Sequence, residues 1–251
     1  MVTVLVILVV AVWCCSLVFG RTFYPPSDVW RVITGEQVSG ASFTVGRLRL
    51  PRATLGLICG FSFGLGGVVF QTMLRNPLAS PDIIGISSGA SAAAVFSIVS
   101  LSLGGAAVSA LAIVAALAVV IFVPVLLSQS RDLSTTQLGD DTAAALGVRV
   151  SRTRLVIVVA AVGLIAFATA AAGPVAFVAF LSGPVAGRLA GPGTSLLIPA
   201  ALVGALLVLV ADFCGQFAFD TRYPVGVVTG VLGAPYLIYL IIRTNRAGGS
   251  L

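Results

Sequence analysis

The sequence predicts an all-α, polytopic membrane protein that crosses the bilayer about eight times. Hydrophobic residues make up 59% of its 251 residues, charged residues make up only 9%, and the mean hydropathy is +1.14. Such a chain has too little polar surface to cover a soluble globule of its size. Its apolar runs are about 20 residues long, which is the length at which a helix crosses about 30 Å of hydrocarbon. We therefore expect a single membrane domain over residues 1–251.

The candidate crossings follow from breaking the chain at charged residues and at clusters of glycine and proline. They are 2–20, 53–73, 83–103, 105–127, 155–172, 174–190, 195–215 and 224–242. An even number of crossings would put both termini on one side of the membrane. The run 174–190 is short and is interrupted by two prolines and two glycines, so a discontinuous or re-entrant helix is an alternative to a full span there.

The crossing at 53–73 carries glycine at every fourth position, which leaves one helix face nearly bare and lets a neighbouring helix approach closely. A polar amide near the end of this helix would need a partner or water. An Asn-Pro hinge and a second apolar run follow. We interpret this region as half of a transport pathway, a role that is compatible with helix packing. The residues assigned to pathway or packing are Gly60, Gly64, Gly67, Gln71, Asn76, Pro77, Gly85 and Gly89.

A polar interruption at 136–154 predicts a short helix on the membrane surface. Asp140 or Asp141 can cap the helix through its free N–H groups, and Gly147 can end it in the left-handed conformation. Two interpretations remain open. The physical argument alone favours a solvated connector, whereas the functional alternative is a docking helix that fits a groove on a cytosolic motor protein.

Two further features concern the second half of the chain. Residues 52–90 and 154–190 share a plan of arginine, apolar helix, Pro/Gly hinge and further apolar chain, which is the pattern of an inverted repeat. Asp212 follows a long apolar run, and a carboxylate at membrane depth is costly unless it is paired or lines water.

Composition also excludes several classes of function. The 14 basic residues are all arginines spread through short loops, so the net charge of +6 does not indicate nucleic-acid binding. The chain has no histidine, no P-loop motif and no metal-ligand spacing. We therefore expect neither an enzyme nor a bound cofactor or metal site, and any metal cargo would arrive already chelated.

Five blocks of sequence resemble the FecCD family, the membrane permeases of ABC importers for iron-siderophores, haem and cobalamin. They are LRLPR at 48–52, GGVVFQTMLRNPLASPDIIGISSGA at 66–90, LGDDTAAALGVRV at 138–150, GPVAFVAFLSGP at 173–184 and PVGVVTGVLGAPYLIYLI at 224–241. The segments SGPVAGR at 182–188 and ADFCGQ at 211–216 look most similar to the ferric-siderophore, enterobactin-like branch.

The resemblance implies an inverted-repeat, type II permease with a first repeat at 47–127, a coupling loop at 128–154 and a second repeat at 155–243. Arg49 and Arg52 match outer arginines that, in the family, receive acidic residues of the substrate-binding protein. The residues that match the helix seated in the ATPase subunit are Leu138, Gly139, Asp140, Asp141, Thr142, Ala143, Leu146 and Gly147.

The partners that the resemblance implies are a cytosolic ATP-binding subunit, an extracytoplasmic siderophore-binding protein and a second permease subunit, identical or different. The substrate would pass between the two permease subunits without a covalent step. The expected location is the inner (plasma) membrane of a bacterial cell, in which the chain is a multi-pass protein.

Two departures from the family pattern stand out. Family members are longer and ordinarily have about ten spans, and the missing material falls between about Ala118 and Phe122. Gln216 stands where some relatives place another outer arginine. Two rival functions therefore stay open: a truncated permease remnant that does not transport, and a small secondary transporter for which Asp212 is the candidate ion relay.

Overall fold

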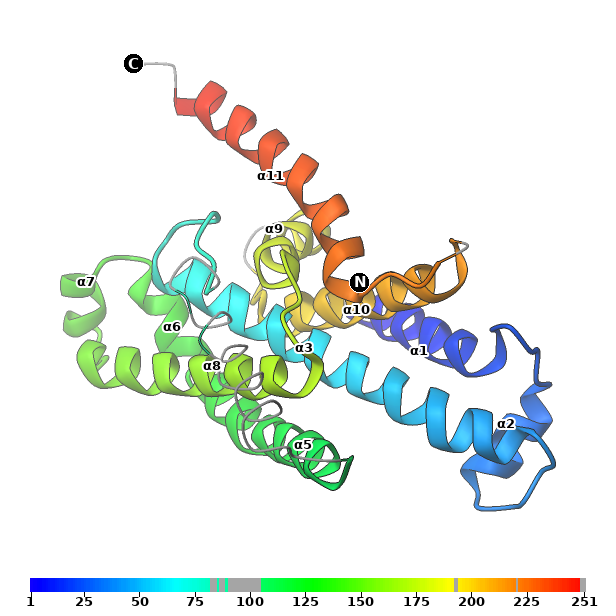
Figure 1. Ribbon diagram of the computed structural model, residues 1–251. Coiled ribbons are helices and arrows are strands. Elements are labelled where there is room, and N and C mark those ends of the chain that lie inside the picture. The colour runs from blue at the N-terminus through cyan, green and yellow to red at the C-terminus, as the bar shows by residue number, and fades with distance from the viewer. Residues whose placement is uncertain (82–84, 86–88, 90–104, 192–193, 220, 249–251) are drawn as a thin grey trace.

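The computed structural model describes residues 1–81, 85, 89, 105–191, 194–219 and 221–248. Within these ranges the chain is helical and forms no strand (Figure 1), which confirms the all-α prediction. The helices are α1 (Val2–Val18), α2 (Pro26–Ile33), η1 (Ser42–Arg49), α3 (Leu50–Met73), α5 (Gly105–Ser128), α6 (Ser130–Thr136), α7 (Asp140–Ala145), α8 (Val150–Ala172), α9 (Val178–Ala190), α10 (Leu197–Phe217) and α11 (Val225–Gly248).

The predicted crossings coincide with helices wherever the structure describes them. Most of the run 83–103 lies outside the described residues. By length and hydropathy, three described helices could cross a membrane, namely Ser42–Met73, α8 and α10. A fourth is possible if Ala116–Ser128 and Ser130–Thr136, which meet at a bend of 52°, form one span. The first part of α11, α1 and α9 are shorter apolar helices.

The interrupted run 174–190 forms a short helix. Its N-cap residue, Phe177, has a left-handed backbone with φ of 64°, and α9 then continues for 13 residues. At about 1.5 Å per residue this helix is about 20 Å long, less than the about 30 Å of hydrocarbon that a full crossing requires. The run therefore matches the discontinuous alternative better than a full span.

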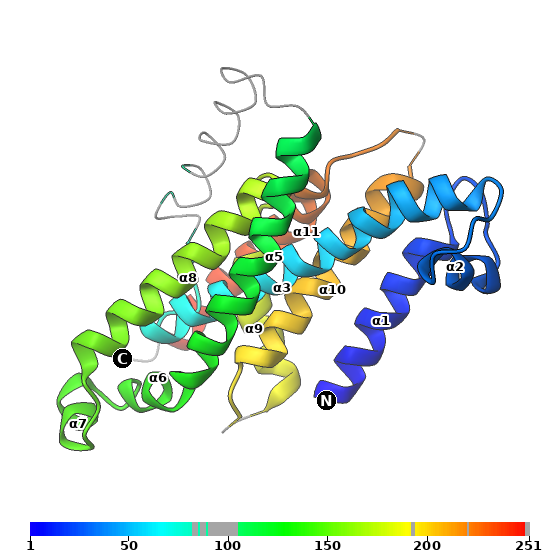
Figure 2. The same ribbon diagram turned by 90° about the horizontal axis from the view of Figure 1, so that it is seen from below.

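Helix α3 lies at the centre of the molecule and packs against α8, α9 and α10 (Figure 2). Its glycines allow the closest of these contacts. A Cβ atom on Gly60 would lie 2.5 Å from the carbonyl oxygen of Gly204 in α10, and one on Gly64 would meet the carbonyl oxygen of Ala200. Gly67 approaches the backbone of Ala179 in α9 in the same way. All three glycines therefore serve helix packing, because any larger residue would push the backbones apart.

The order of these contacts shows that α3 runs antiparallel to α10. Successive glycines toward the C-terminal end of α3 meet successively earlier residues of α10. The same holds for α8, because the Cys59 thiol donates to the carbonyl oxygen of Ala168 while Gly66 meets Ile165. The N-terminal end of α3 and the C-terminal end of α10 therefore lie together at one end of the molecule.

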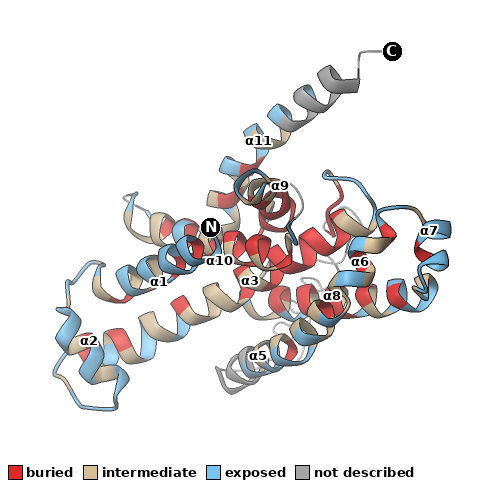
Figure 3. Cartoon of the chain, turned by 180° about the vertical axis from the view of Figure 1, so that it is seen from behind, coloured by how far each residue is buried: buried red, intermediate tan, exposed pale blue. Residues whose placement is uncertain are grey.

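Burial follows this arrangement. Buried residues concentrate on α3 and on the faces of α8, α9 and α10 that meet it, while α1 and α11 keep exposed faces (Figure 3). Those exposed faces are apolar: Ile7 of α1 is 61% exposed and Val231 of α11 is 68% exposed. In water such faces would be unfavourable, whereas in a bilayer lipid tails cover them.

Candidate functional site

The polar side chains gather at the two ends of the helix bundle. At one end the N-terminal part of α3 meets the C-terminal ends of α1 and α10. At the other end the C-terminal end of α3 meets α6 and the start of α8, and α7 packs against α6 and α8 (Figure 1). We call the first group the arginine pocket, which comprises Arg21, Arg49, Arg52, Asp212 and Arg222. We call the second group the Asp140 cluster, which comprises Arg75, Asp140 and Arg154.

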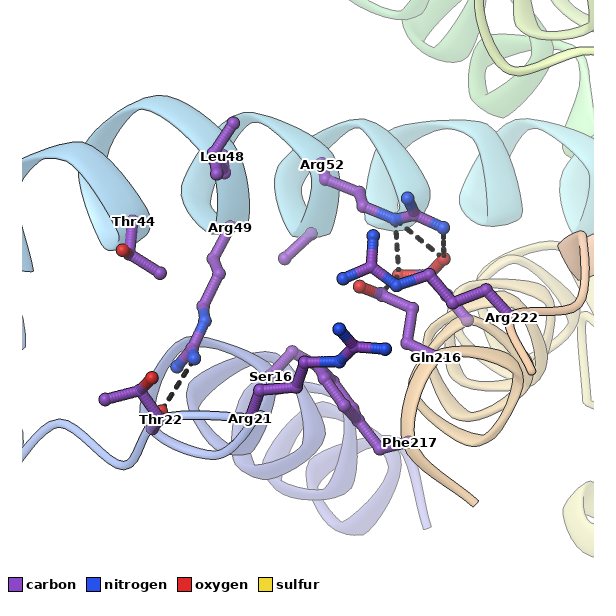
Figure 4. Close-up of a pocket in the computed structure, with 12 residues that line it drawn as sticks. Ser16, Arg21, Thr22, Thr44, Leu48, Arg49, Arg52, Gln216, Phe217 and Arg222 are labelled. Carbon is purple, nitrogen blue, oxygen red and sulfur yellow. Dashed lines mark hydrogen bonds and ion pairs between the residues drawn. The ribbon is translucent and has the colours of Figure 1, made fainter. Parts of the chain in front are cut away.

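An ion pair between Arg52 and Asp212 forms one wall of the arginine pocket (Figure 4). The Arg52 Nη2 and Nε atoms lie 2.7 and 3.0 Å from Asp212 Oδ1, and Nε lies 3.2 Å from Oδ2. The Gln216 amide donates to Oδ2 at 2.7 Å. The side chain of Asp212 is only 9% exposed, so these donors replace the water that the carboxylate has lost. The pairing expected for Asp212 is present, with Arg52 as its partner.

Arg49 is held by backbone rather than by a carboxylate. Its guanidinium donates to the carbonyl oxygens of Leu17, Val18 and Thr22 at 2.9, 3.2 and 2.7 Å, and it stacks on Tyr24 with 5.3 Å between the guanidinium carbon and the ring centre. The last carbonyls of a helix have no partner within the helix and carry partial negative charge. Arg49 therefore caps α1 and fixes it to the start of α3.

The remaining arginines of this end are less constrained. The pocket has a volume of about 370 Å³, and Arg21 and Arg222 line it together with Arg49 and Arg52. Within the part of the chain that the structure describes, no carboxylate pairs with Arg21 or Arg222. No motif in the sequence singles out these two residues among the 14 arginines of the chain.

The Asp140 cluster ties three helices together at the opposite end. Arg75, which follows α3, donates to Asp140 Oδ1 at 2.8 Å and to the carbonyl oxygen of Thr136 at 2.6 Å. Arg154 of α8 lies 3.1 Å from Asp140 Oδ2. All three charged side chains are nearly half exposed, so the cluster gains less from each pair than a buried site would.

The short helix α7 forms as the sequence predicts, but its capping differs. The N-cap residue is Gly139, and no side chain caps the helix, so the prediction that Asp140 or Asp141 does so is wrong. The reason is that the helix begins at Asp140, so both aspartates lie within its first turn and not at the N-cap position, and Arg75 and Arg154 bind the Asp140 carboxylate. At the other end, Gly147 has φ of +88°, the left-handed conformation expected there. The helix presents Leu138 and Leu146 to solvent, 67% and 64% exposed.

The amide and hinge residues of α3 are also accounted for. The Gln71 amide donates to the carbonyl oxygen of Phe180 at 2.9 Å, which satisfies a buried polar group and attaches α9 to α3. The Asn76 side chain accepts a hydrogen bond from the Leu78 N–H at 2.9 Å, so Asn76 and Pro77 form a turn after the helix. The second apolar run expected after it, which contains Gly85 and Gly89, lies mostly outside the described residues.

A central glycine-notched helix, several further apolar helices and separate polar ends define a multi-pass membrane protein. The sequence profile of the FecCD transport family matches residues 7–123 and 100–243. The chain therefore belongs to the FecCD transport family.

Relatives of known role match nearly the whole chain. The achromobactin transport system permease protein CbrC of Dickeya dadantii (strain 3937) is 32% identical, over 98% of this chain and 92% of that protein. The ferric enterobactin transport system permease protein FepG of Escherichia coli (strain K12) is 31% identical, over 95% of this chain and 93% of that protein. The CbrC alignment has 320 positions and this chain has 251 residues, so the relative contains internal segments that this chain lacks.

A solved structure supports the fold. A chain described as an inward-facing conformation of a metal-chelate type ABC transporter superposes with a TM-score of 0.74. The match covers 96% of this chain and 98% of that one, at 21% identity. The helices described above therefore have the same arrangement as those of that chain.

Proposed function

We propose that this chain is the permease subunit of an ATP-driven importer for iron(III)-siderophore complexes in the inner (plasma) membrane of a bacterium. The observation that carries the proposal is family membership over nearly the whole chain, together with siderophore permeases among the relatives. In this account the substrate passes between two permease subunits. A separate cytosolic ATPase supplies the energy, and an extracytoplasmic binding protein delivers the chelate.

The contact with the ATPase is assigned to α7 and the residues that flank it. Leu138 and Leu146 are apolar and highly exposed at the two ends of a short surface helix, which suits insertion into an apolar groove of a partner. Asp141 is exposed beside them. Asp140 is assigned a positioning role, because Arg75 and Arg154 already hold its carboxylate and so connect α7 to α3 and α8.

The contact with the binding protein is assigned to the opposite end. Arg49 and Arg52 sit at the start of α3, where Arg49 is half-buried and Arg52 is exposed, and the guanidinium groups of both are bound within the chain. Their positive charge contributes to the electrostatic potential of the docking face, and this potential would attract the acidic residues of a binding protein.

Co-purification tests the ATPase contact. Leu138→Asp with Leu146→Asp should lower recovery of the cognate ATPase by at least about tenfold, because two charges would enter the apolar contact. The matched control is Trp30→Asp with Phe43→Asp, which alters two apolar residues of similar exposure, 67% and 62%, at the other end of the molecule. Unchanged recovery in the Leu138/Leu146 variant would reject α7 as the docking helix.

The missing internal segments favour one second candidate, a permease remnant that pairs with a longer subunit but does not transport. The two candidates differ in a direct measurement. An active permease supports ATP-dependent uptake when it is the only permease chain present, whereas a remnant supports uptake only together with a full-length partner.

A further inference from the structure

We propose that the arginine pocket binds a small oxyanion, of the carboxylate or phosphate kind, through Arg21 and Arg222. The proposal goes beyond the transport function, since anion binding by the purified chain requires neither the ATPase nor the binding protein. It assigns a ligand to a cavity of about 370 Å³ that lies between α1, η1 and the end of α10.

The first step is the balance of charge in the pocket. Four arginines line it, and Asp212 is the only acidic residue among the lining residues that the structure describes. Positive groups held this close repel one another, and a bound anion relieves that repulsion. Asp220 precedes Arg222 by two positions in the sequence and lies outside the described residues.

The second step separates the arginines that are already bound from those that are not. Arg49 donates to three carbonyl oxygens, and Arg52 uses Nε and Nη2 on Asp212. Arg21 and Arg222 are exposed, and neither has a hydrogen bond or ion pair within the described part of the chain. A guanidinium offers five donors in a planar fork, which matches the oxygens of a carboxylate or phosphate. These two residues therefore have free donors for a ligand.

The third step is geometry. In Figure 4 the guanidinium groups of Arg21 and Arg222 point toward the same space, next to the Arg52–Asp212 pair. Arg21 follows α1 and Arg222 follows α10, so two separate elements supply the two cations. The cavity is larger than a single carboxylate needs, and a small polycarboxylate such as citrate could contact both arginines at once.

The binding test uses the full chain in nanodiscs of phosphatidylcholine, a lipid without net charge, at low salt. Citrate and inorganic phosphate are titrated separately by calorimetry. We expect saturable binding, and Arg21→Gln with Arg222→Gln should weaken it by at least about tenfold, which equals about 1.4 kcal/mol. The affinity of Arg21→Lys with Arg222→Lys should lie between those of the unaltered chain and the glutamine variant, because lysine keeps the positive charge but lacks the planar fork of donors.

The matched control is Arg31→Gln with Arg47→Gln. It removes the same charge at the same end of the molecule, from two arginines outside the pocket lining. If this control loses as much affinity as Arg21→Gln with Arg222→Gln, the binding depends on net charge and not on the pocket, and the proposal is overturned. Absence of saturable binding by the unaltered chain, or unchanged affinity in Arg21→Gln with Arg222→Gln, would also overturn it.

A second arm identifies the source of the anion. In nanodiscs containing phosphatidylglycerol, the negative surface repels citrate from every variant, which lowers its apparent affinity by a common factor. A lipid phosphate that occupies the pocket would also compete with citrate, so the affinity should then fall more in the unaltered chain than in Arg21→Gln with Arg222→Gln. An equal fall in the two would identify the ligand as a free anion. Recovery of the ATPase through α7 should be unaffected in every variant, so failure of this proposal is distinguishable from failure of the transport proposal.

Discussion

The two polar ends of the molecule use the same chemistry in different surroundings. Asp212 and Asp140 each bind arginine across the fold, but the side chain of Asp212 is 9% exposed and that of Asp140 is 47% exposed. Burial removes water that an unpaired carboxylate would otherwise recover, so loss of a partner is costly for Asp212 and nearly neutral for Asp140. The Arg52–Asp212 pair is therefore a fixed part of the fold, whereas the exposed Asp140 cluster can rearrange at little cost in free energy.

Replacing the partner of the buried carboxylate should have the largest effect. Of the donors that the structure describes on Asp212, Arg52→Gln leaves the Gln216 amide, so we expect a loss of about 3 kcal/mol in the free energy of unfolding. Asp212→Asn should cost less, because Arg52 is half exposed and can bind water instead. Unfolding in detergent, followed by circular dichroism, measures both. A larger loss for Asp212→Asn than for Arg52→Gln would contradict this asymmetry.

Removal of the arginine that caps α1 should have the second largest effect on stability. Arg49→Gln deletes three charge-assisted hydrogen bonds to backbone carbonyls, and about 1.5–3 kcal/mol of stability should be lost. Hydrogen exchange should show faster opening of the C-terminal turn of α1. Arg47→Gln, a change at an exposed arginine of the same segment, is the control and should leave both measurements unchanged.

At the other end, Asp140→Asn should change stability by only about 0–1 kcal/mol. The substitution should instead weaken the coupling between the two subunits. The ATPase should still co-purify, but the permease should stimulate ATP hydrolysis less. The reason is that α7 would no longer be tied to α3 and α8 by charge. If Asp140→Asn abolishes co-purification, Asp140 contacts the ATPase directly and its positioning role is wrong.

The smallest expected effect is that of salt. At about 1 M salt the screening length falls to about 3 Å, so exposed pairs weaken more than buried ones. Amide exchange in α7 should therefore increase with salt, and exchange in α10 near Asp212 should not. Equal sensitivity of the two helices would show that the two ends do not differ in the way described.

The helices could be predicted from the sequence because long apolar runs are visible in it directly. The partner of Asp212 could not be predicted. The cost of a buried carboxylate indicates that a partner is needed, but Arg52 lies 160 positions away in the sequence. For the same reason the capping of α1 by Arg49, 31 to 32 positions away, has no local signal.

The site residues also show that contacts between distant parts of the chain have no local signal in the sequence. The short helix α7 and its left-handed end at Gly147 follow from local sequence, whereas its capping was predicted wrongly because Arg75 and Arg154 reach Asp140 through the fold. Arg21 and Arg222 enter one pocket only because α1 and α10 end at the same side of α3. The roles assigned to Arg49 and Arg52 in docking, and to Gly85 and Gly89 in a pathway, stay predictions.

We propose that this chain forms the path for the substrate while other subunits supply the energy and deliver the cargo. The decisive measurement uses proteoliposomes that contain this permease and the cognate ATPase, with the binding protein and a radiolabelled ferric siderophore added outside. Accumulation inside the vesicles should require ATP and should be lost when the ATPase is omitted or when Leu138→Asp with Leu146→Asp is introduced. Uptake by the permease alone without nucleotide, or no uptake with every component present, would refute the proposal.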